Sequence, residues 1–198
     1  MQASLKRDFV SVDDYLAGEE ASEVKHEYVG GAVYAMAGVS KDHNLIALNI
    51  YTAVRNGLRG GPCRAYVSDV KVHLKLRGEN VFYYPDVMVG CDARDTHRLY
   101  LQYPKILVEV SSESTERLDR REKRLSYQTI ETLEEYVIAA QDRVEVTIFR
   151  RTNNWRPEVL NRLSDNINLK SIGLSFKLSS ICEGVTASRP SRKSRTGV

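Results

Sequence analysis

Two apolar runs in the middle of this chain each carry one acidic residue where a buried strand normally carries none. The runs are residues 81–89, which contain Asp86, and residues 104–111, which contain Glu109. Runs rich in Val, Ile and aromatic residues are typical of strands that pack on both faces. An ionised carboxylate there is costly unless it is paired, hydrogen-bonded or bound to a metal. The two acids together therefore indicate a divalent-metal site.

The kind of metal follows from the ligands. Alternation along a strand places Asp86 on the same face as Met88, and Glu109 on the same face as Leu107. If the two strands are neighbours, the carboxylates can converge on one point. Hard oxygen ligands suit Mg²⁺ or Mn²⁺, and Mg²⁺ completes its shell with water and substrate phosphate. Either acid alone could be a turn residue or the partner of an arginine, but the pair favours phosphoryl chemistry.

A lysine follows on a predicted helix over residues 115–129. Asp119, Lys123 and Tyr127 recur every four residues and so lie on one stripe of that helix. In one interpretation Asp119 and Lys123 form an exposed ion pair worth about 0.2–0.5 kcal/mol. In the other, Lys123 reaches back over the strand ends, where it orients a water nucleophile or stabilises charge on a phosphate.

Asp69 and Lys71 form a second acid-x-lysine pair, on a predicted half-buried strand over residues 64–76. Alternation places both side chains on the outward face. We expect them to form the wet face of an edge strand. The other interpretation is a rival catalytic set that would displace Asp86 and Lys123.

His43 lies near the start of a predicted long helix over residues 41–58, whose apolar positions fall on one face. Ser40 is the expected N-cap. The imidazole could contact a phosphate or act as a general base. A capping or surface histidine is the more common arrangement at a helix start.

The remaining elements complete an order of helix and hairpin, long helix, several strands, helix, more strands. Gly30-Gly31 predicts a tight turn between strands over residues 26–29 and 32–36. Further strands are predicted over residues 135–139, 144–149, 155–160 and 174–178. This order predicts an α/β or α+β domain with a mixed central β-sheet flanked by helices.

Length and composition set modest limits. The chain has 198 residues, 28% charged and 42% apolar, which is ordinary for a globular protein. We expect a single domain over residues 1–183 and a basic disordered tail over residues 184–198. The net charge of +3 is too small to indicate nucleic-acid binding by itself.

The three cysteines and the hydropathy bear on location. Cys63, Cys91 and Cys182 offer neither a disulfide framework nor a paired zinc motif, so a reducing cytoplasm is expected. No stretch reaches the about 18 apolar residues of a membrane span. We expect no contact with a membrane.

Several of these residues resemble the Uma-type restriction endonuclease family, part of the PD-(D/E)XK nuclease superfamily. The resemblance extends from Tyr15 to about Phe149. Its motifs are Tyr84-Pro85-Asp86-Val87-Met88-Val89, residues 106–115, and Asp119, Lys123 and Tyr127, together with residues 26–31, 36–38, His43 and residues 67–72.

The resemblance implies a restriction-endonuclease-like fold and a phosphodiesterase site that uses Mg²⁺ or Mn²⁺. Asp86 matches the Asp of the "PD" motif, and Glu109 matches the acid of the "(D/E)XK" motif. Ser111 occupies the lysine position of that motif and cannot supply a positive charge. The resemblance therefore makes Lys123 the best candidate for the displaced lysine, and Glu27 a possible further metal ligand.

Two functions remain open. The leading hypothesis is a hydrolase: a Mg²⁺-dependent endonuclease that cleaves phosphodiester bonds in DNA and acts as a homodimer. The alternative is a catalytically inactive nuclease-fold module that binds nucleic acid or a protein partner, motivated by Ser111 and by the weak net charge.

Overall fold

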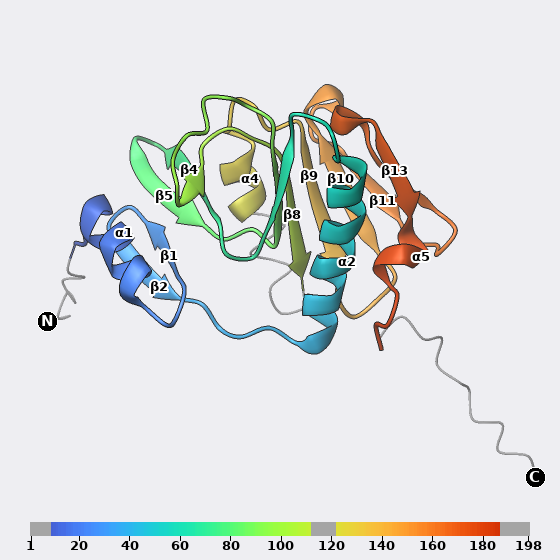
Figure 1. The fold of residues 1–198 in the computed structure, drawn as a ribbon, viewed down its shortest axis with the longest axis horizontal. Coiled ribbons are helices and arrows are strands. Elements are labelled where there is room, and N and C mark those ends of the chain that lie inside the picture. Colours follow the sequence, from blue (N-terminus) through green and yellow to red (C-terminus); the bar gives the residue numbers. More distant parts are fainter. Residues whose placement is uncertain (1–8, 112–121, 187–198) are drawn as a thin grey trace, which may run out of the picture.

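Two sheets meet in the computed structural model, which describes residues 9–111 and 122–186 (Figure 1). The first sheet has the order β2 (Ala32–Ala35), β1 (His26–Val29), β5 (Glu79–Tyr83), β4 (Lys71–Leu76) and β7 (Tyr100–Leu101). The second has the order β11 (Pro157–Leu160), β10 (Val146–Arg150), β9 (Glu135–Ala140), β8 (Pro104–Ser111), β6 (Val87–Gly90) and β3 (Arg64–Val67). Both sheets are mixed, since β8 pairs in parallel with β9, and β4 pairs in parallel with β7.

Helices and a small hairpin complete the fold. The helices are α1 (Val12–Ala21), α2 (Lys41–Gly57), α4 (Arg124–Tyr127) and α5 (Leu178–Ile181), and the hairpin pairs β12 (Asn166–Leu169) with β13 (Leu174–Lys177). Short 3-10 turns lie at η2 (Arg151–Asn153) and η3 (Lys170–Ile172). The predicted class, a mixed sheet flanked by helices, is confirmed.

The second sheet is buried on both faces. On one face, side chains such as Val108 pack against α2, α5 and the β12–β13 hairpin. On the other face, Met88 and Leu107 pack against α4 and the first sheet. Adjacent residues of β8 therefore point to opposite cores, as the alternation predicted. Helix α1 packs separately, with Tyr15 against Tyr28 and Phe82 of the first sheet.

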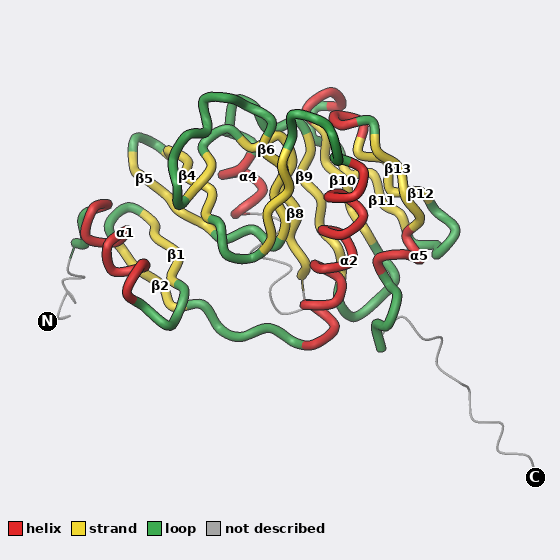
Figure 2. The backbone as a smooth tube through the Cα atoms, in the orientation of Figure 1, coloured by secondary structure: helices red, strands yellow, loops and turns green. Residues whose placement is uncertain are grey.

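Helix α2 forms where the sequence predicted it. The Ser40 hydroxyl accepts a hydrogen bond from the backbone N–H of His43 and so caps the first turn. Ile46, Ile50 and Val54 form the buried stripe that faces the second sheet. The loop between β2 and α2 (green in Figure 2) runs from the hairpin to the start of this helix.

The predicted strand over residues 81–89 is wrong as one strand. Its first part is β5 of the first sheet and its second part is β6 of the second sheet, with Tyr84-Pro85-Asp86 between them. Proline lacks the N–H that a central strand donates, so the ladder breaks there. Asp86 consequently lies at the junction of the two sheets rather than in the middle of a strand.

The predicted strand over residues 64–76 divides in the same way, into β3 and β4. Ser68, with φ +57°, turns the chain between the sheets and donates its N–H to the carbonyl of Asp86. This turn buries Lys71, which is only 5% exposed, so the expected wet face is wrong for this residue. It is right for Asp69, whose side chain is 83% exposed and pairs with Lys25.

The expectation that the cysteines offer no disulfide is also wrong, because Cys63 and Cys91 form one. Arg64 pairs with Gly90 across β3 and β6, so the two cysteines lie opposite each other just beyond this pair. Cys182 has a free thiol. Among the described residues no helix is long and apolar enough to cross a membrane.

The predicted helix over residues 115–129 also differs from the structure at its end. The described helix α4 ends at Tyr127, and Leu125 is 54% exposed while Ser126 and Tyr127 are buried. Asp119 and residues 112–121 lie outside the described residues. Val185, within the predicted tail, is buried in the core, so the fold extends at least to that residue. Residues 187–198 of the tail are outside the described part.

Candidate functional site

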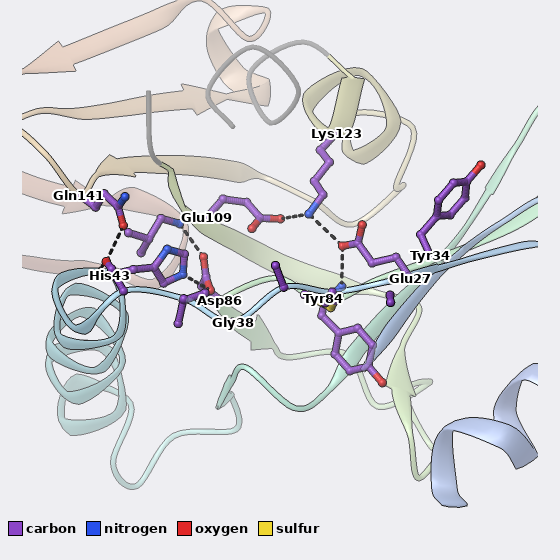
Figure 3. A pocket seen from close by; sticks show the side chains of 15 residues that line it. Glu27, Tyr34, Gly38, His43, Tyr84, Asp86, Glu109, Lys123 and Gln141 are labelled. Carbon is purple, nitrogen blue, oxygen red and sulfur yellow. Dashed lines mark hydrogen bonds and ion pairs between the residues drawn. The ribbon is translucent and has the colours of Figure 1, made fainter. Parts of the chain in front are cut away.

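A cavity of about 350 Å³ opens where β6 and β8 reach the start of α2 and the β1–β2 hairpin. It brings together residues that lie far apart in the sequence (Figure 3). Its charged and polar lining includes six residues of interest, Glu27, His43, Asp86, Glu109, Lys123 and Gln141. Four of these six were predicted as primary site residues, and His43 as a secondary one.

Asp86 is fixed just before β6, at the junction of the two sheets, by two hydrogen-bond partners. Its Oδ2 accepts the backbone N–H of Val110 at 2.7 Å, and its Oδ1 lies 2.8 Å from Nε2 of His43. Val87 pairs with Val108, so one further step of the same register places Asp86 opposite Glu109. The antiparallel pairing of β6 with β8 therefore places the two acids opposite each other, and both line the same cavity.

Glu109 is held by groups from the segment that follows it. The hydroxyl of Tyr127 donates to its Oε1 at 2.8 Å, and the ammonium of Lys123 lies 3.4 Å from the same oxygen. Burial, followed by the charge of Glu109, raises the pKa of Tyr127 well above its usual value. Tyr127 thus remains a protonated donor. The sequence placed Tyr127 on the same helical stripe as Lys123, and this contact shows that its hydroxyl binds Glu109.

Lys123 lies between two carboxylates. Its Nζ is 2.9 Å from Oε1 of Glu27 as well as near Glu109, and its side chain is only 12% exposed. The same oxygen of Glu27 accepts the backbone N–H of Tyr84 at 3.4 Å. The ammonium also lies 5.3 Å from the centre of the Tyr83 ring. Lys123 is therefore directed into the cavity, whereas Asp119, its predicted partner in the other interpretation, lies outside the described residues.

The donor set suits a hard divalent cation. Glu27, Asp86 and Glu109 offer carboxylate oxygens within one cavity. Across the described ranges, no three His, Cys, Asp or Glu side chains are close enough to form a complete metal cage. Mg²⁺ does not require such a cage, because it commonly takes one or two carboxylates and fills its shell with water and phosphate. The residues present therefore fit Mg²⁺ or Mn²⁺.

Ser111 and Gln141 occupy the end of the central strands. Ser111 is buried, and its carbonyl accepts the backbone N–H of Gln141 at 3.0 Å. The Gln141 side chain accepts the Ser40 hydroxyl at 2.9 Å and lines the cavity. Gln141 was not among the residues predicted for the site. The available signal was its position directly after β9, the parallel neighbour of β8.

The rival pair lies elsewhere. Asp69 bonds to Lys25, and the ammonium of Lys71 lies 5.1 Å from the centre of the Tyr84 ring. Burial lowers the pKa of Lys71, with the opposite influence of Glu19 and Glu20 smaller. Neither Asp69 nor Lys71 is among the residues that line the cavity. The geometry thus favours Asp86, Glu109 and Lys123 as the set to test, and their catalytic roles remain predictions.

Comparisons with known proteins agree with this architecture. The model of the family Uma2, described as "Putative restriction endonuclease", matches residues 12–179. The uncharacterized protein slr1290 of Synechocystis sp. is 38% identical over 178 residues, which cover 89% of this chain and 93% of that protein. A second protein of the same organism, sll1609, is 25% identical over 160 residues, covering 79% of this chain and 89% of that protein.

One solved structure shares the fold. It is the crystal structure of "a putative nuclease belonging to DUF820" from Anabaena variabilis, with a TM-score of 0.66 and 15% sequence identity. The match covers 87% of this chain and 97% of that one. At this identity the likeness shows the fold alone.

Proposed function

This chain belongs to the Uma2 family of restriction-endonuclease-like proteins, and we propose that it is a divalent-metal-dependent endonuclease that hydrolyses phosphodiester bonds in DNA. One observation carries the proposal: Asp86, Glu109 and Lys123 line a single cavity, with the ammonium 3.4 Å from Glu109. Carboxylates can hold a divalent cation that polarises the phosphate, and a nearby lysine can stabilise the negative charge that develops on it.

Each residue has a role that follows from its position. Asp86 and Glu109 would hold Mg²⁺ or Mn²⁺, which when bound supplies a Lewis acid for the phosphate. Lys123 stabilises the negative charge that develops on the phosphate oxygens. It supplies the charge that Ser111 cannot. Glu27 orients the Lys123 ammonium and is a further candidate ligand.

The supporting contacts hold these groups in place. Tyr127 donates to Glu109, while the Val110 N–H and His43 hold the Asp86 carboxylate. Because such contacts reduce the freedom of the acids before substrate arrives, they favour a site that is already organised for reaction. His43 is therefore assigned to the positioning of Asp86.

Cleavage of plasmid DNA with Mg²⁺ tests the acids directly. We expect Asp86→Ala and Glu109→Ala each to lower the cleavage rate by on the order of 10²-fold or more. Glu131→Ala is the matched control, because it removes an acid whose side chain is 71% exposed and is not among the residues that line the cavity. Equal cleavage by all four proteins would overturn the proposal.

A second candidate function is a nuclease-fold module that binds nucleic acid or a protein partner without cutting. Ser111 in the motif position favours it, as does the pairing of Lys123 with two acids. This module needs no tight divalent site. Titration calorimetry that shows Mg²⁺ or Mn²⁺ binding, abolished in Asp86→Ala, would count against it.

Assembly as a homodimer is the remaining part of the proposal. It is supported by the family resemblance. Sedimentation equilibrium of the full chain tests it. A mass of twice 22.5 kDa is expected, whereas a monomer at micromolar concentration would contradict the assembly without touching the proposed chemistry.

A further inference from the structure

The lining of the cavity combines two kinds of residues. Its charged and titratable side chains include Glu27, Asp86, Glu109, Lys123 and His43. Its mostly apolar lining comes from Tyr34, Ala35 and the segment of residues 36–39, which we call the strap. The strap has the sequence Met-Ala-Gly-Val. Tyr34 is 44% exposed and Val39 is 57% exposed, so this apolar lining faces the solvent-filled space.

Strand pairing places Tyr34 next to the charged residues of the cavity. It lies directly opposite Glu27 in the β1–β2 register. Side chains of such a pair project from the same face, with Cβ atoms about 4.5–5.5 Å apart. Glu27 in turn contacts Lys123 at 2.9 Å. Figure 3 shows the Tyr34 ring beside the Glu27 carboxylate, at the same end of the cavity.

A nucleotide would match this combination of charged and apolar lining, because it joins an anionic phosphodiester to a flat, largely apolar base. We propose that Tyr34 and the strap form a subsite for one unpaired base beside the scissile phosphate. This inference rests on the proposed function and names its substrate class, which is DNA with a single-stranded or frayed segment. Bases inside an intact duplex are stacked on their neighbours, so an exposed ring can stack only on a base that has left the helix.

The space beyond Asp86 supports a strand that continues past the site. A second cavity of about 310 Å³ adjoins the first. The two cavities share the strap, His43, Tyr84 and Asp86. A single strand can therefore occupy both, with its scissile phosphate near Asp86 and one base against Tyr34.

Binding of labelled oligonucleotides to the full chain tests this subsite. Fluorescence anisotropy with Ca²⁺ in place of Mg²⁺ compares a single strand with a blunt duplex of the same sequence. We expect the wild type to prefer the single strand, because base stacking on an aromatic ring contributes about 1–3 kcal/mol. Tyr34→Ala should weaken single-strand binding by about five- to 150-fold, while duplex binding stays within about twofold.

Two variants make the result specific. Tyr34→Phe keeps the ring and should retain the affinity of the wild type. Val159→Ala removes an exposed apolar side chain from β11, outside both cavities, and should also bind normally. If Tyr34→Ala binds single strands like the wild type, the subsite is refuted. If Tyr34→Phe is as weak as Tyr34→Ala, the hydroxyl rather than stacking is responsible, and the proposal fails too.

The failures of the two proposals are distinguishable. Loss of single-strand affinity in Tyr34→Ala, with no cleavage of any DNA by the wild type, would support the subsite and contradict the endonuclease. Rapid cleavage of intact duplex that is unaffected by Tyr34→Ala would support the endonuclease and overturn the subsite.

Discussion

Individual hydrogen bonds determine how the candidate acids are presented. Glu109 is almost fully buried, yet its carboxylate has the Tyr127 hydroxyl and the Lys123 ammonium as partners. Asp86 is supported by a backbone N–H and a histidine. Since a buried carboxylate without partners is costly, the neighbours of these acids are as important as the acids themselves.

Removal of the Tyr127 hydroxyl is the most conservative test of this support. Tyr127→Phe keeps the ring but deletes a hydrogen bond to a buried carboxylate, which should destabilise the fold by about 1.5–3 kcal/mol. It should also lower kcat, because Glu109 loses an orienting contact. Urea unfolding and cleavage kinetics measure the two effects.

Tyr28→Phe is the matched control, since Tyr28 is another buried tyrosine and donates to the carbonyl of Val10 away from the cavity. It should lower stability with kcat unchanged. Equal kcat values for the two variants would contradict a positioning role for Tyr127.

His73 gives a prediction about pH. It is buried, stacked on Phe82 at 4.4 Å, and bonded to Asn80 and Gln102. Burial lowers its pKa below the usual 6.5, partly opposed by the Asn80 bond. Below pH 6.5 the unfolded chain therefore binds more protons at this residue than the folded chain. Its stabilising contribution is complete above that pH and decreases as the pH falls toward the lowered value.

The free energy of unfolding, measured by urea titration across this pH range, should show a smaller acid-side slope in His73→Gln than in the wild type. His97→Gln, at an exposed position, is the control. A slope that is unchanged in His73→Gln would contradict the assignment.

At the scale of elements, the start of α2 links helix capping to the site. The Ser40 hydroxyl accepts the N–H of His43 and donates to Gln141, and His43 in turn contacts Asp86. Two strand breaks, at Ser68 and at Pro85, then bring Asp86 to the junction of the sheets. The position of the site therefore depends on where elements end.

Ser40→Ala should consequently affect both stability and activity. Loss of the cap should cost about 1 kcal/mol, and DNA cleavage should decrease because His43 and Gln141 lose an anchor. Ser11→Ala, which removes the equivalent cap of α1 through Asp14, is the control. It should cost a similar free energy and leave cleavage unchanged. Thermal unfolding and cleavage assays distinguish the two variants, and equal cleavage by both would contradict the link.

Local patterns predicted the elements whose signals are contained in short stretches. Helix α2, the Gly30-Gly31 hairpin and strands β8 to β10 all follow from periodicity, capping or turn residues. The two divided strands did not, because an apolar run has the same pattern whether it stays in one sheet or crosses to another. Pro85 was the one local sign of such a crossing.

The residue types of the site were predicted from the sequence, but the contacts between them were not. Asp86 and Glu109 are visible in the sequence because acids are rare in buried strands, and Lys123 because of its helical spacing. The contacts of His43 with Asp86 and of Gln141 with Ser40 span 43 and 101 residues. The Cys63–Cys91 disulfide likewise depends on strand register. Such contacts depend on tertiary packing, which local patterns do not record.

At the scale of the whole molecule, two sheets and the β2–α2 connection enclose one cavity that holds every primary candidate residue. Family membership shows a restriction-endonuclease-like chain, and restriction-endonuclease-like families generally use divalent metals. The departure at Ser111 makes the source of positive charge the central question. We assign that charge to Lys123.

Single-turnover cleavage of DNA with Mg²⁺ by three lysine variants tests this assignment most directly. Lys123→Met should lower the rate by about 10²–10³-fold. Two control variants should keep a rate close to that of the wild type. Lys105→Met removes a lysine of β8 that pairs with Glu134, and Lys71→Met removes the lysine of the rival pair. Wild-type cleavage by Lys123→Met, or a comparable loss only in Lys71→Met, would contradict the account.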